Sequence, residues 1–384
     1  LFQSETKKLK EVAFMINEER LLNRFLNYVQ IDSPTKEERE FAEYLKKEME
    51  SIGLDVIMDD AGKKADSNSG NLIGKLKGNT SGETILFSAH MDTVSPGIGI
   101  KPQIRDGIIY SDGTTILGGD DKAGIAAIME ALETIKENSI PHGDIEVVFT
   151  IHEEGGLYGA KNLDYSNLDA KLGFVFDSGG EPGEIIVQGP AQNKINVKFI
   201  GKEAHAGVAP EEGISAIQMA SYAINNMNLL RIDEKTTANI GIISGGKATN
   251  IVTKEVIIEA EARSLEDKKL EKQTEHMVKC CKDAEEKFGG KVEIEVENAY
   301  GAFKVDTNHR VVKMVKKACE NLGLKPYTTT SGGGSDTNIL NANEITAVNL
   351  GIGEKNPHTL EEHLHIKDLE NAARLALEII KVFG

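Results

Sequence analysis

The chain has 384 residues, and its 61 Asp and Glu outnumber its 44 Lys and Arg, which gives a net charge of −17. This charge argues against nucleic acid or an anionic membrane as a partner, and no apolar stretch approaches the roughly 20 residues of a membrane span. The length favours two domains, and the three cysteines form no disulfide framework, so with no visible signal peptide we expect a cytoplasmic protein.

Two helices are predicted near the N-terminal end. Apolar residues recur at helical spacing over 21–29. Thr35-x-x-Glu38 has the pattern of a capping box, which predicts the start of a second helix that ends near Gly53.

Three short apolar runs follow, at 85–89, 147–151 and 172–176. Continuous apolar runs of this length are typical of strands buried on both faces, as in a parallel sheet with helices on each side. The runs end in side chains that bind metal ions, namely His90 and Asp92, His152 with Glu153 and Glu154, and Asp177. Since ligands bind beyond the carboxyl ends of such strands, these side chains predict a site for a divalent ion.

A fourth acidic group comes from a loop. Asp120 and Asp121 follow two glycines and precede a stretch of helix formers that runs to about Lys136. This pattern predicts a buried helix with acidic residues at its N-terminus, where the helix dipole favours anions.

Three histidines near the C-terminal end are candidates for a fifth ligand. His358 lies at a loop tip beyond the apolar run 345–350, which makes it the best placed of the three. His363 and His365 alternate with apolar residues and could form the exposed face of a short extended segment.

The pattern changes at residue 189. The region 189–301 predicts a βαββαβ order, which is that of a ferredoxin-like unit with both helices on one face of an open sheet. Its predicted elements are strand 194–200, helix 213–230, strands 238–243 and 255–262, helix 265–288 and strand 291–297. The first pattern then resumes with helix 308–321, strand 345–350 and helix 367–383. We therefore expect an α/β catalytic domain with a mainly parallel sheet, formed by 5–188 and 302–384, into which 189–301 is inserted.

Each motif taken alone has a structural explanation. His90 and Asp92 could be a buried pair, Asp120 a helix cap, Glu153 part of a solvated charge pair and Asp177 a turn residue. Adjacent carboxylates at the end of a buried strand repel each other, however, unless a cation lies between them. Four such groups at the same edge of one sheet make coincidence a poor explanation.

The segments 88–94, 118–124 and 152–155 resemble the M20 family of co-catalytic zinc peptidases, and 115–124 is most similar to its peptidase T branch. The resemblance implies two zinc ions per chain, for which cobalt or manganese can substitute. It assigns His90 and Asp177 to one ion, Glu154 and His358 to the other, and Asp120 to both. It also implies that the Asp120–Asp121 peptide bond is cis.

The same resemblance assigns roles in catalysis and substrate binding. Glu153 is implied as the general base and Asp92 as the support of His90, while His205 is implied as a lid residue that stabilises the oxyanion. Asn250 and Arg263 resemble the family's contacts to the substrate. The loop 331–336 lacks the ending of a phosphate loop, so we interpret Gly333 as part of the backbone lining of the substrate cleft.

The predicted function is therefore that of a dinuclear zinc exopeptidase that hydrolyses short peptides in the manner of a tripeptide aminopeptidase. A carboxypeptidase or an N-acyl-amino-acid amidohydrolase of the same family would share every metal ligand. A metal-binding scaffold without catalysis is the alternative from another class, and the presence of Glu153 argues against it. The resemblance also implies a homodimer formed through the inserted domain.

Overall fold

The computed structural model describes residues 16–384 and divides into two units. A nine-stranded sheet organises the larger unit. The larger unit comprises the described residues up to Val187 together with 304–330 and 335–384. The smaller unit comprises 188–303 and 331–334.

The sheet of the larger unit has four parallel strands at its centre. In spatial order its strands are β1 (Asp55–Met58), β2 (Leu72–Leu76), β6 (Ile145–Thr150), β3 (Ile85–His90), β7 (Leu172–Ser178), β16 (Thr346–Gly351), β8 (Glu184–Gly189) and β14 (Phe303–Lys304), and β15 (Tyr327–Thr330) pairs with β8. Strands β6, β3, β7 and β16 run parallel, whereas β2 and β8 join them antiparallel. The predicted α/β class with a mainly parallel central sheet is confirmed.

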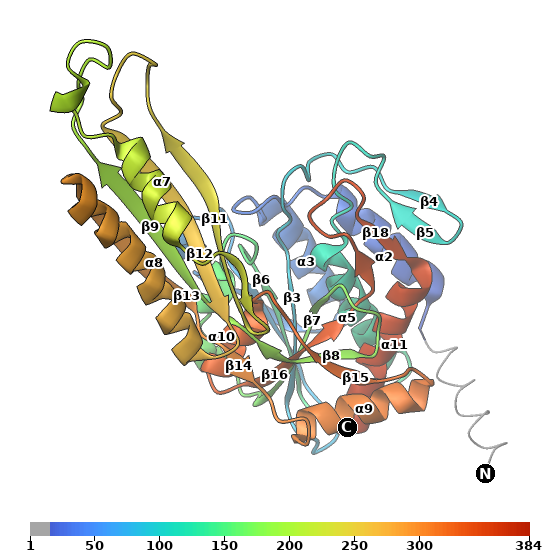
Figure 1. Ribbon diagram of the computed structural model, residues 1–384. Helices are drawn as coiled ribbons and strands as arrows, with labels where there is room; N and C mark the ends of the chain where they lie inside the picture. The colour runs from blue at the N-terminus through green and yellow to red at the C-terminus, as the bar shows by residue number, and fades with distance from the viewer. Residues whose placement is uncertain (1–15) are drawn as a thin grey trace. The chain divides into compact units, whose positions relative to one another are not determined.

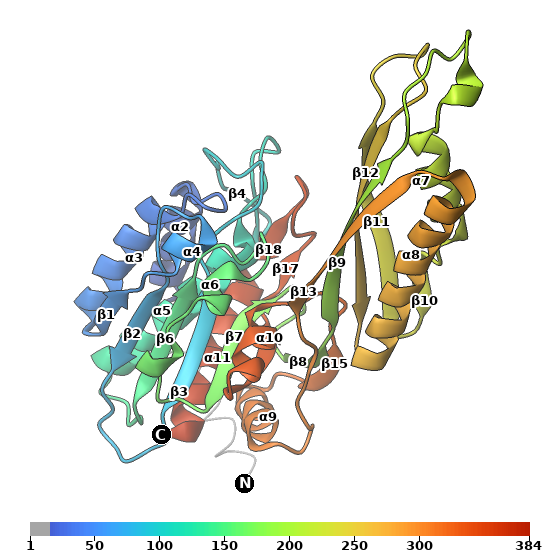
Figure 2. The same ribbon diagram turned by 90° about the vertical axis from the view of Figure 1, so that its left-hand side faces the viewer.

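Helices cover both faces of this sheet (Figures 1 and 2). The helices of this unit are α2 (Glu18–Gln30), α3 (Arg39–Ile52), α4 (Gly62–Ala65), α5 (Gly119–Glu137), α6 (Tyr158–Lys161), α9 (Arg310–Leu322), α10 (Asp336–Ala342) and α11 (Ile366–Phe383). Phe87 of β3 contacts Phe174 and Phe176 of β7, and Phe174 contacts Phe383 of α11 on the same face. On the opposite face, Leu86 and Val148 pack with Leu340 of α10.

A second, four-stranded sheet carries part of the C-terminal segment. Its order is β17 (Glu354–Lys355), β18 (His363–His365), β5 (Ile108–Tyr110) and β4 (Gln103–Arg105). His363 and His365, which alternate with apolar residues in the sequence, lie in β18 and are half-buried. The ring of His363 stacks on Tyr110 with the ring centroids 5.3 Å apart.

The smaller unit has the predicted ferredoxin-like order. Its sheet runs β10 (Leu230–Asp233), β11 (Thr236–Gly245), β12 (Glu255–Ser264), β9 (Ala191–Ile200) and β13 (Lys291–Tyr300), and its helices are α7 (Ala216–Asn226) and α8 (Asp267–Phe288). Met219 of α7 and Met277 of α8 are buried in one core with Val197 and Ile258 of the sheet. Both helices therefore cover the same face.

Two details of the predicted elements are wrong. Thr35 and Glu38 form no capping box, because the Thr35 hydroxyl donates to Asp92 and α3 begins only at Arg39. The predicted helix 213–230 is too long, since Ser215 caps α7 by accepting a hydrogen bond from the Gln218 backbone, and the chain enters the unpredicted strand β10 at its other end.

Candidate metal centre

The carboxyl ends of three neighbouring strands bring the predicted ligands together. Strand β3 lies between β6 and β7 and ends in His90. Glu153 and Glu154 follow β6, and Asp177 lies near the end of β7. The start of α5 adds Asp120. The side chains are held at this edge because the parallel register aligns the ends of β3 and β6, as the sequence predicts.

The carboxylate of Asp120 lies between two imidazoles. Its Oδ1 atom is 2.9 Å from Nε2 of His90, and its Oδ2 atom is 3.2 Å from Nε2 of His358. Nε2 of His358 is also 2.8 Å from Oε1 of Glu154, and Nε2 of His90 is 3.6 Å from Oδ1 of Asp177. The arrangement contains two sets of ligand atoms that share one carboxylate, which suits two cations bridged by Asp120.

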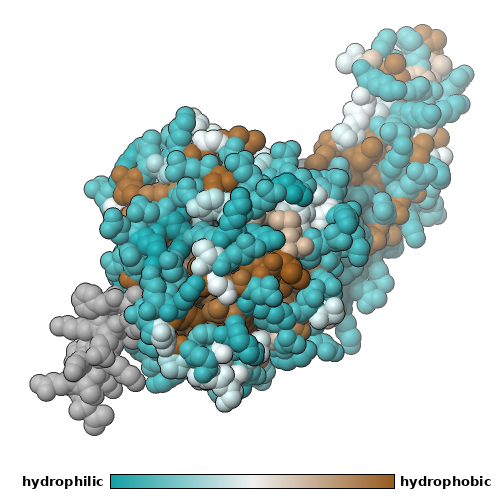
Figure 3. Space-filling view, turned by 180° about the vertical axis from the view of Figure 1, so that it is seen from behind, coloured by the Kyte–Doolittle hydropathy of each residue, from teal (hydrophilic) through white to brown (hydrophobic). Residues whose placement is uncertain are grey.

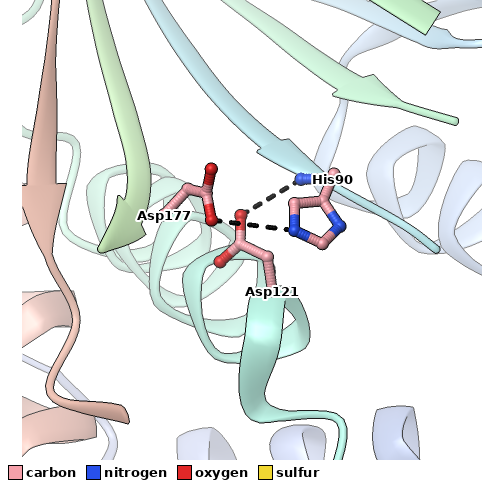
Figure 4. A group of neighbouring side chains, drawn as sticks. All are labelled: His90, Asp121 and Asp177. Carbon is pink, nitrogen blue, oxygen red and sulfur yellow. Dashed lines mark hydrogen bonds and ion pairs between the residues drawn. The ribbon is translucent and has the colours of Figure 1, made fainter. Parts of the chain in front are cut away.

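Asp121 belongs to the cluster as well, although the sequence did not predict it as a ligand. Oδ2 of Asp121 accepts a hydrogen bond of 3.1 Å from the backbone N–H of His90 (Figure 4). Its Oδ1 atom is buried and has no hydrogen-bond partner among residues 16–384. Ligand atoms of His90, Asp121 and Asp177 lie within 4.8 Å of one another. The Asp120–Asp121 peptide bond is cis, as the family resemblance implies.

Asp92 supports the residues around it. The carboxylate is fully buried and accepts hydrogen bonds from the backbone N–H groups of Glu153 and Glu154, at 2.8 and 3.2 Å, and from the hydroxyl of Thr35 at 2.9 Å. Its backbone carbonyl lies 2.9 Å from Nδ1 of His90, which leaves Nε2 of that ring facing Asp120. Asp92 therefore fixes both the imidazole and the Glu153–Glu154 backbone.

Burial and mutual repulsion dominate the electrostatics of the cluster. Burial, together with the neighbouring carboxylates, raises the pKa of Glu153 and Asp121 well above the usual range. Contacts with Asp120 and Glu154 raise the pKa of His358 to about 10. Burial lowers the pKa of His90, but its contacts with Asp120, Asp177 and Asp92 outweigh that effect and raise it.

Because their pKa values are raised, these side chains hold protons at positions where metal cations would fit. A buried carboxylate oxygen without a partner, such as Oδ1 of Asp121, has the unmet demand for positive charge that a metal ion supplies. Two imidazoles with several carboxylates are a donor set typical of zinc, cobalt or manganese sites. The residues therefore fit a dinuclear metal centre.

The ring of His152 contacts residues outside this cluster. Its Nδ1 atom lies 2.8 Å from the carbonyl oxygen of Ala65, and its ring packs against Tyr158 with the ring centroids 4.8 Å apart. The residue that ends the apolar run of β6 is thus a structural histidine, and only the two glutamates that follow it reach the cluster.

The remaining predicted site residues lie in the smaller unit. His205 and Asn250 are exposed and occupy neighbouring loops, where the backbone N–H of Ala206 donates to the carbonyl of Asn250 at 2.9 Å. Arg263 is paired with Glu261 and lies beside Gly333. The structure thus places His205 near Asn250, and Arg263 near Gly333.

Comparison with known proteins identifies the family of this chain. The model of peptidase family M20/M25/M40 matches residues 86–382. The chain belongs to this family. It is therefore a peptide-bond hydrolase, and its relatives place it in the peptidase T-like branch that the motifs predict.

Two solved structures are 47% identical to this chain, and each covers 96% of it and 99% of its own chain. They are the aminopeptidase PepT of Bacillus cereus, with a TM-score of 0.88, and a tripeptidase of Staphylococcus aureus, with a TM-score of 0.93. Peptidase T of Streptococcus equi is 30% identical over 94% of this chain and 99% of its own length. Within residues 16–384, no helix is long and apolar enough to span a membrane.

Proposed function

We propose that the chain is a dinuclear zinc aminopeptidase that removes the N-terminal residue from tripeptides and similar short peptides in the cytoplasm. The observation that carries the proposal is the Asp120 carboxylate, shared between His90 and His358, together with the buried Glu153, whose backbone N–H donates to Asp92. The names of the relatives at 47% identity, an aminopeptidase and a tripeptidase, support this substrate class.

The proposed ligands are His90 and Asp177 for one ion, His358 and Glu154 for the other, and Asp120 for both. Asp121 lies close enough to the first set to add a ligand or to orient His90. When bound, two such ions supply Lewis acidity toward the scissile carbonyl and the attacking water.

Glu153 performs the proton transfer in this proposal. Its carboxylate takes a proton from the attacking water and delivers it to the nitrogen of the leaving amine. The hydrogen bond from its backbone N–H to Asp92 fixes the position of Glu153 while the proton moves. Burial and the neighbouring carboxylates raise its pKa, which makes the ionised form a stronger base.

The test combines a substrate panel with one substitution. Tripeptides with a free N-terminus should be cleaved, whereas the same peptides with a blocked N-terminus should not. Glu153→Gln should keep the metal content and lower kcat by a factor of about 10² to 10⁴. As a matched control, Glu154→Gln should lose bound metal. Cleavage of N-blocked peptides would contradict the aminopeptidase assignment, and metal loss in Glu153→Gln would contradict the role of Glu153.

We also propose that the smaller unit forms a homodimer and supplies His205 to the partner's site. Strand β10 pairs with β11 only as far as Ala238, and Ile242 and Ile243 beyond it are 51% and 58% exposed. Hydrophobic side chains reach the surface of this unit in Figure 3. An apolar edge of this kind is commonly covered by a second chain.

Complementation tests the role of His205 across the interface. Refolded mixtures of Glu153→Gln and His205→Ala chains should regain activity, because one site of each mixed dimer has both groups intact. Mixed dimers without activity would show that His205 does not act across the interface.

A further inference from the structure

A buried carboxylate outside the metal-ligand set holds the loop that carries Asp120. Glu362 is 1% exposed and accepts four hydrogen bonds from consecutive backbone N–H groups. Its Oε2 atom accepts from Leu117 and Gly118 at 2.8 and 2.9 Å, and its Oε1 atom accepts from Gly119 and Asp120 at 2.7 and 3.1 Å. These contacts join parts of the chain that are 242 to 245 residues apart.

The loop is shaped to receive a carboxylate. Gly118 has φ of 70°, a left-handed conformation that favours glycine. A Cβ atom at Gly119 would lie 3.1 Å from Oε1 of Glu362, so a larger residue would press on the carboxylate. The four donor N–H groups, from Leu117 to Asp120, lie before or in the kinked start of α5, where Asp120 has non-helical φ and ψ. Buried N–H groups of this kind need an acceptor, and a carboxylate supplies a strong one. Glu362 satisfies all four donors at once.

Asp120 is thereby fixed from two directions. On one side, the adjacent Asp121 accepts the backbone N–H of His90, which ties the start of α5 to strand β3. On the other side, Glu362 ties it to the segment that carries His358 four residues earlier. Oδ2 of Asp120 lies 3.2 Å from Nε2 of His358, so the contact of Glu362 with the loop sets the separation of these two proposed ligands.

We propose that Glu362 is a positioning residue that holds Asp120 and His358 at the spacing required by one of the two metal ions. The ion concerned is the one assigned to Asp120, Glu154 and His358. The other ion shares Asp120, but it also depends on His90 and Asp177, and the link of His90 to Asp121 does not involve Glu362. This inference rests on the dinuclear centre proposed above.

Zinc binding to the metal-free protein, measured by equilibrium dialysis, tests the inference without recourse to activity. In Glu362→Gln the side-chain amide offers one acceptor oxygen, while its NH2 group faces two of the N–H donors. We expect one ion to bind as in the wild type and the other to bind about 10-fold to 100-fold more weakly. Glu361→Gln, at the exposed neighbouring position, should bind both ions normally.

Two further variants separate position from charge and from folding. Glu362→Asp keeps the charge but withdraws the carboxylate by one methylene, so it should also weaken one ion. Gly119→Ala keeps Glu362 and displaces it, and it should weaken the same ion even if Glu362→Gln does not fold. Normal zinc affinity in Glu362→Asp beside a loss in Glu362→Gln would show that charge alone matters and would overturn the inference.

The outcomes also separate this inference from the proposed function. A wild-type chain that binds fewer than two zinc ions would refute the dinuclear centre itself. A wild-type chain that binds two ions, with unchanged affinities in Glu362→Gln and Gly119→Ala, would refute only the role of Glu362. An equal loss of both ions in the folded variants would likewise contradict a role confined to the site of His358.

Discussion

Asp92→Asn tests the support of the centre most directly, because it keeps the shape of the side chain and removes one hydrogen-bond acceptor. In the wild type both carboxylate oxygens accept hydrogen bonds, Oδ1 from the backbone of Glu153 and Oδ2 from the backbone of Glu154 and the hydroxyl of Thr35. An asparagine must turn its NH2 group toward one of these oxygens' positions, where it meets a backbone donor.

The size of the expected loss in Asp92→Asn follows from the number of N–H donors left without an acceptor. The Thr35 hydroxyl can rotate to accept from the new NH2 group, but a backbone N–H cannot, so one N–H loses its bond in either orientation of the amide. A hydrogen bond to a charged group contributes about 1.5 to 3 kcal/mol. Since each 1.4 kcal/mol is about tenfold, we expect kcat/KM to fall by a factor of about 10 to 100.

The assay compares kcat/KM on a free tripeptide with zinc affinity in the same preparations. The loss should appear in one or both quantities, because Asp92 supports the base and a metal ligand through the same carboxylate. Asp60→Asn, at an exposed aspartate that forms an ion pair with Lys63, is the matched control and should have wild-type values. If Asp92→Asn stayed within twofold of the wild type in both measurements, the support assigned to this residue would be wrong.

Three further changes test other parts of the structure. Metal analysis of His358→Ala should show the loss of about one ion per chain, whereas His363→Ala and His365→Ala should keep both, and a normal content in the first variant would refute its assignment. Glu130→Gln should lower the free energy of unfolding, measured by urea titration, by about 3 to 5 kcal/mol, because this fully buried carboxylate accepts hydrogen bonds from two arginines of α2. In the same titration Glu137→Gln, at a half-exposed position, should lower it by less than about 1 kcal/mol. Equal losses in the two variants would contradict the role of burial. Removal of the metal ions should make stability fall as the pH rises from about 6 to about 9.

The sequence predicts the ligands that end buried strands because their position depends on a regular pattern. Parallel strands align their carboxyl ends, so His90 and Asp177 are brought to one edge whatever the loops between them do. His152 ends such a run too, yet it turns away, since its φ of 50° puts it in a left-handed conformation that no periodic pattern encodes. The length and periodicity of the apolar runs identify the edge of the sheet where the ligands gather. They do not give the direction of each side chain beyond the end of its strand.

The supporting contacts are less predictable for a different reason. Asp92 and Glu362 act by accepting hydrogen bonds from backbone N–H groups, which every residue except proline carries, so the partner leaves no mark in the sequence. Glu362 stands beside Glu361 in an acidic, histidine-rich segment, where solvated carboxylates are the ordinary expectation. The capping box predicted at Thr35 failed for another reason, since its hydroxyl donates to the side chain of Asp92, which is distant in the sequence, rather than to the following helix.

The expected response to metal removal follows from the direction of four pKa shifts. Without metal, burial and neighbouring carboxylates raise the pKa of Asp121 and Glu153, and contacts with carboxylates raise the pKa of His90 and bring that of His358 to about 10. A raised pKa means that the folded chain binds more protons than the unfolded chain between the two values, so stability declines as the pH rises through that window.

The two carboxyl groups act above the ordinary carboxyl pKa and the two histidines above the ordinary imidazole pKa of 6.5, and all four act in the same direction, so they do not cancel one another. Bound zinc replaces the protons, since its ligands are ionised carboxylates and neutral imidazoles, and it removes most of this dependence up to about pH 9. Urea midpoints of chelator-treated and zinc-saturated protein should therefore diverge as the pH rises from about 6 to about 9, the metal-free midpoint falling. Parallel midpoints over this range would show that the cluster carries no excess of buried negative charge, and the electrostatic argument for two cations would lose its basis.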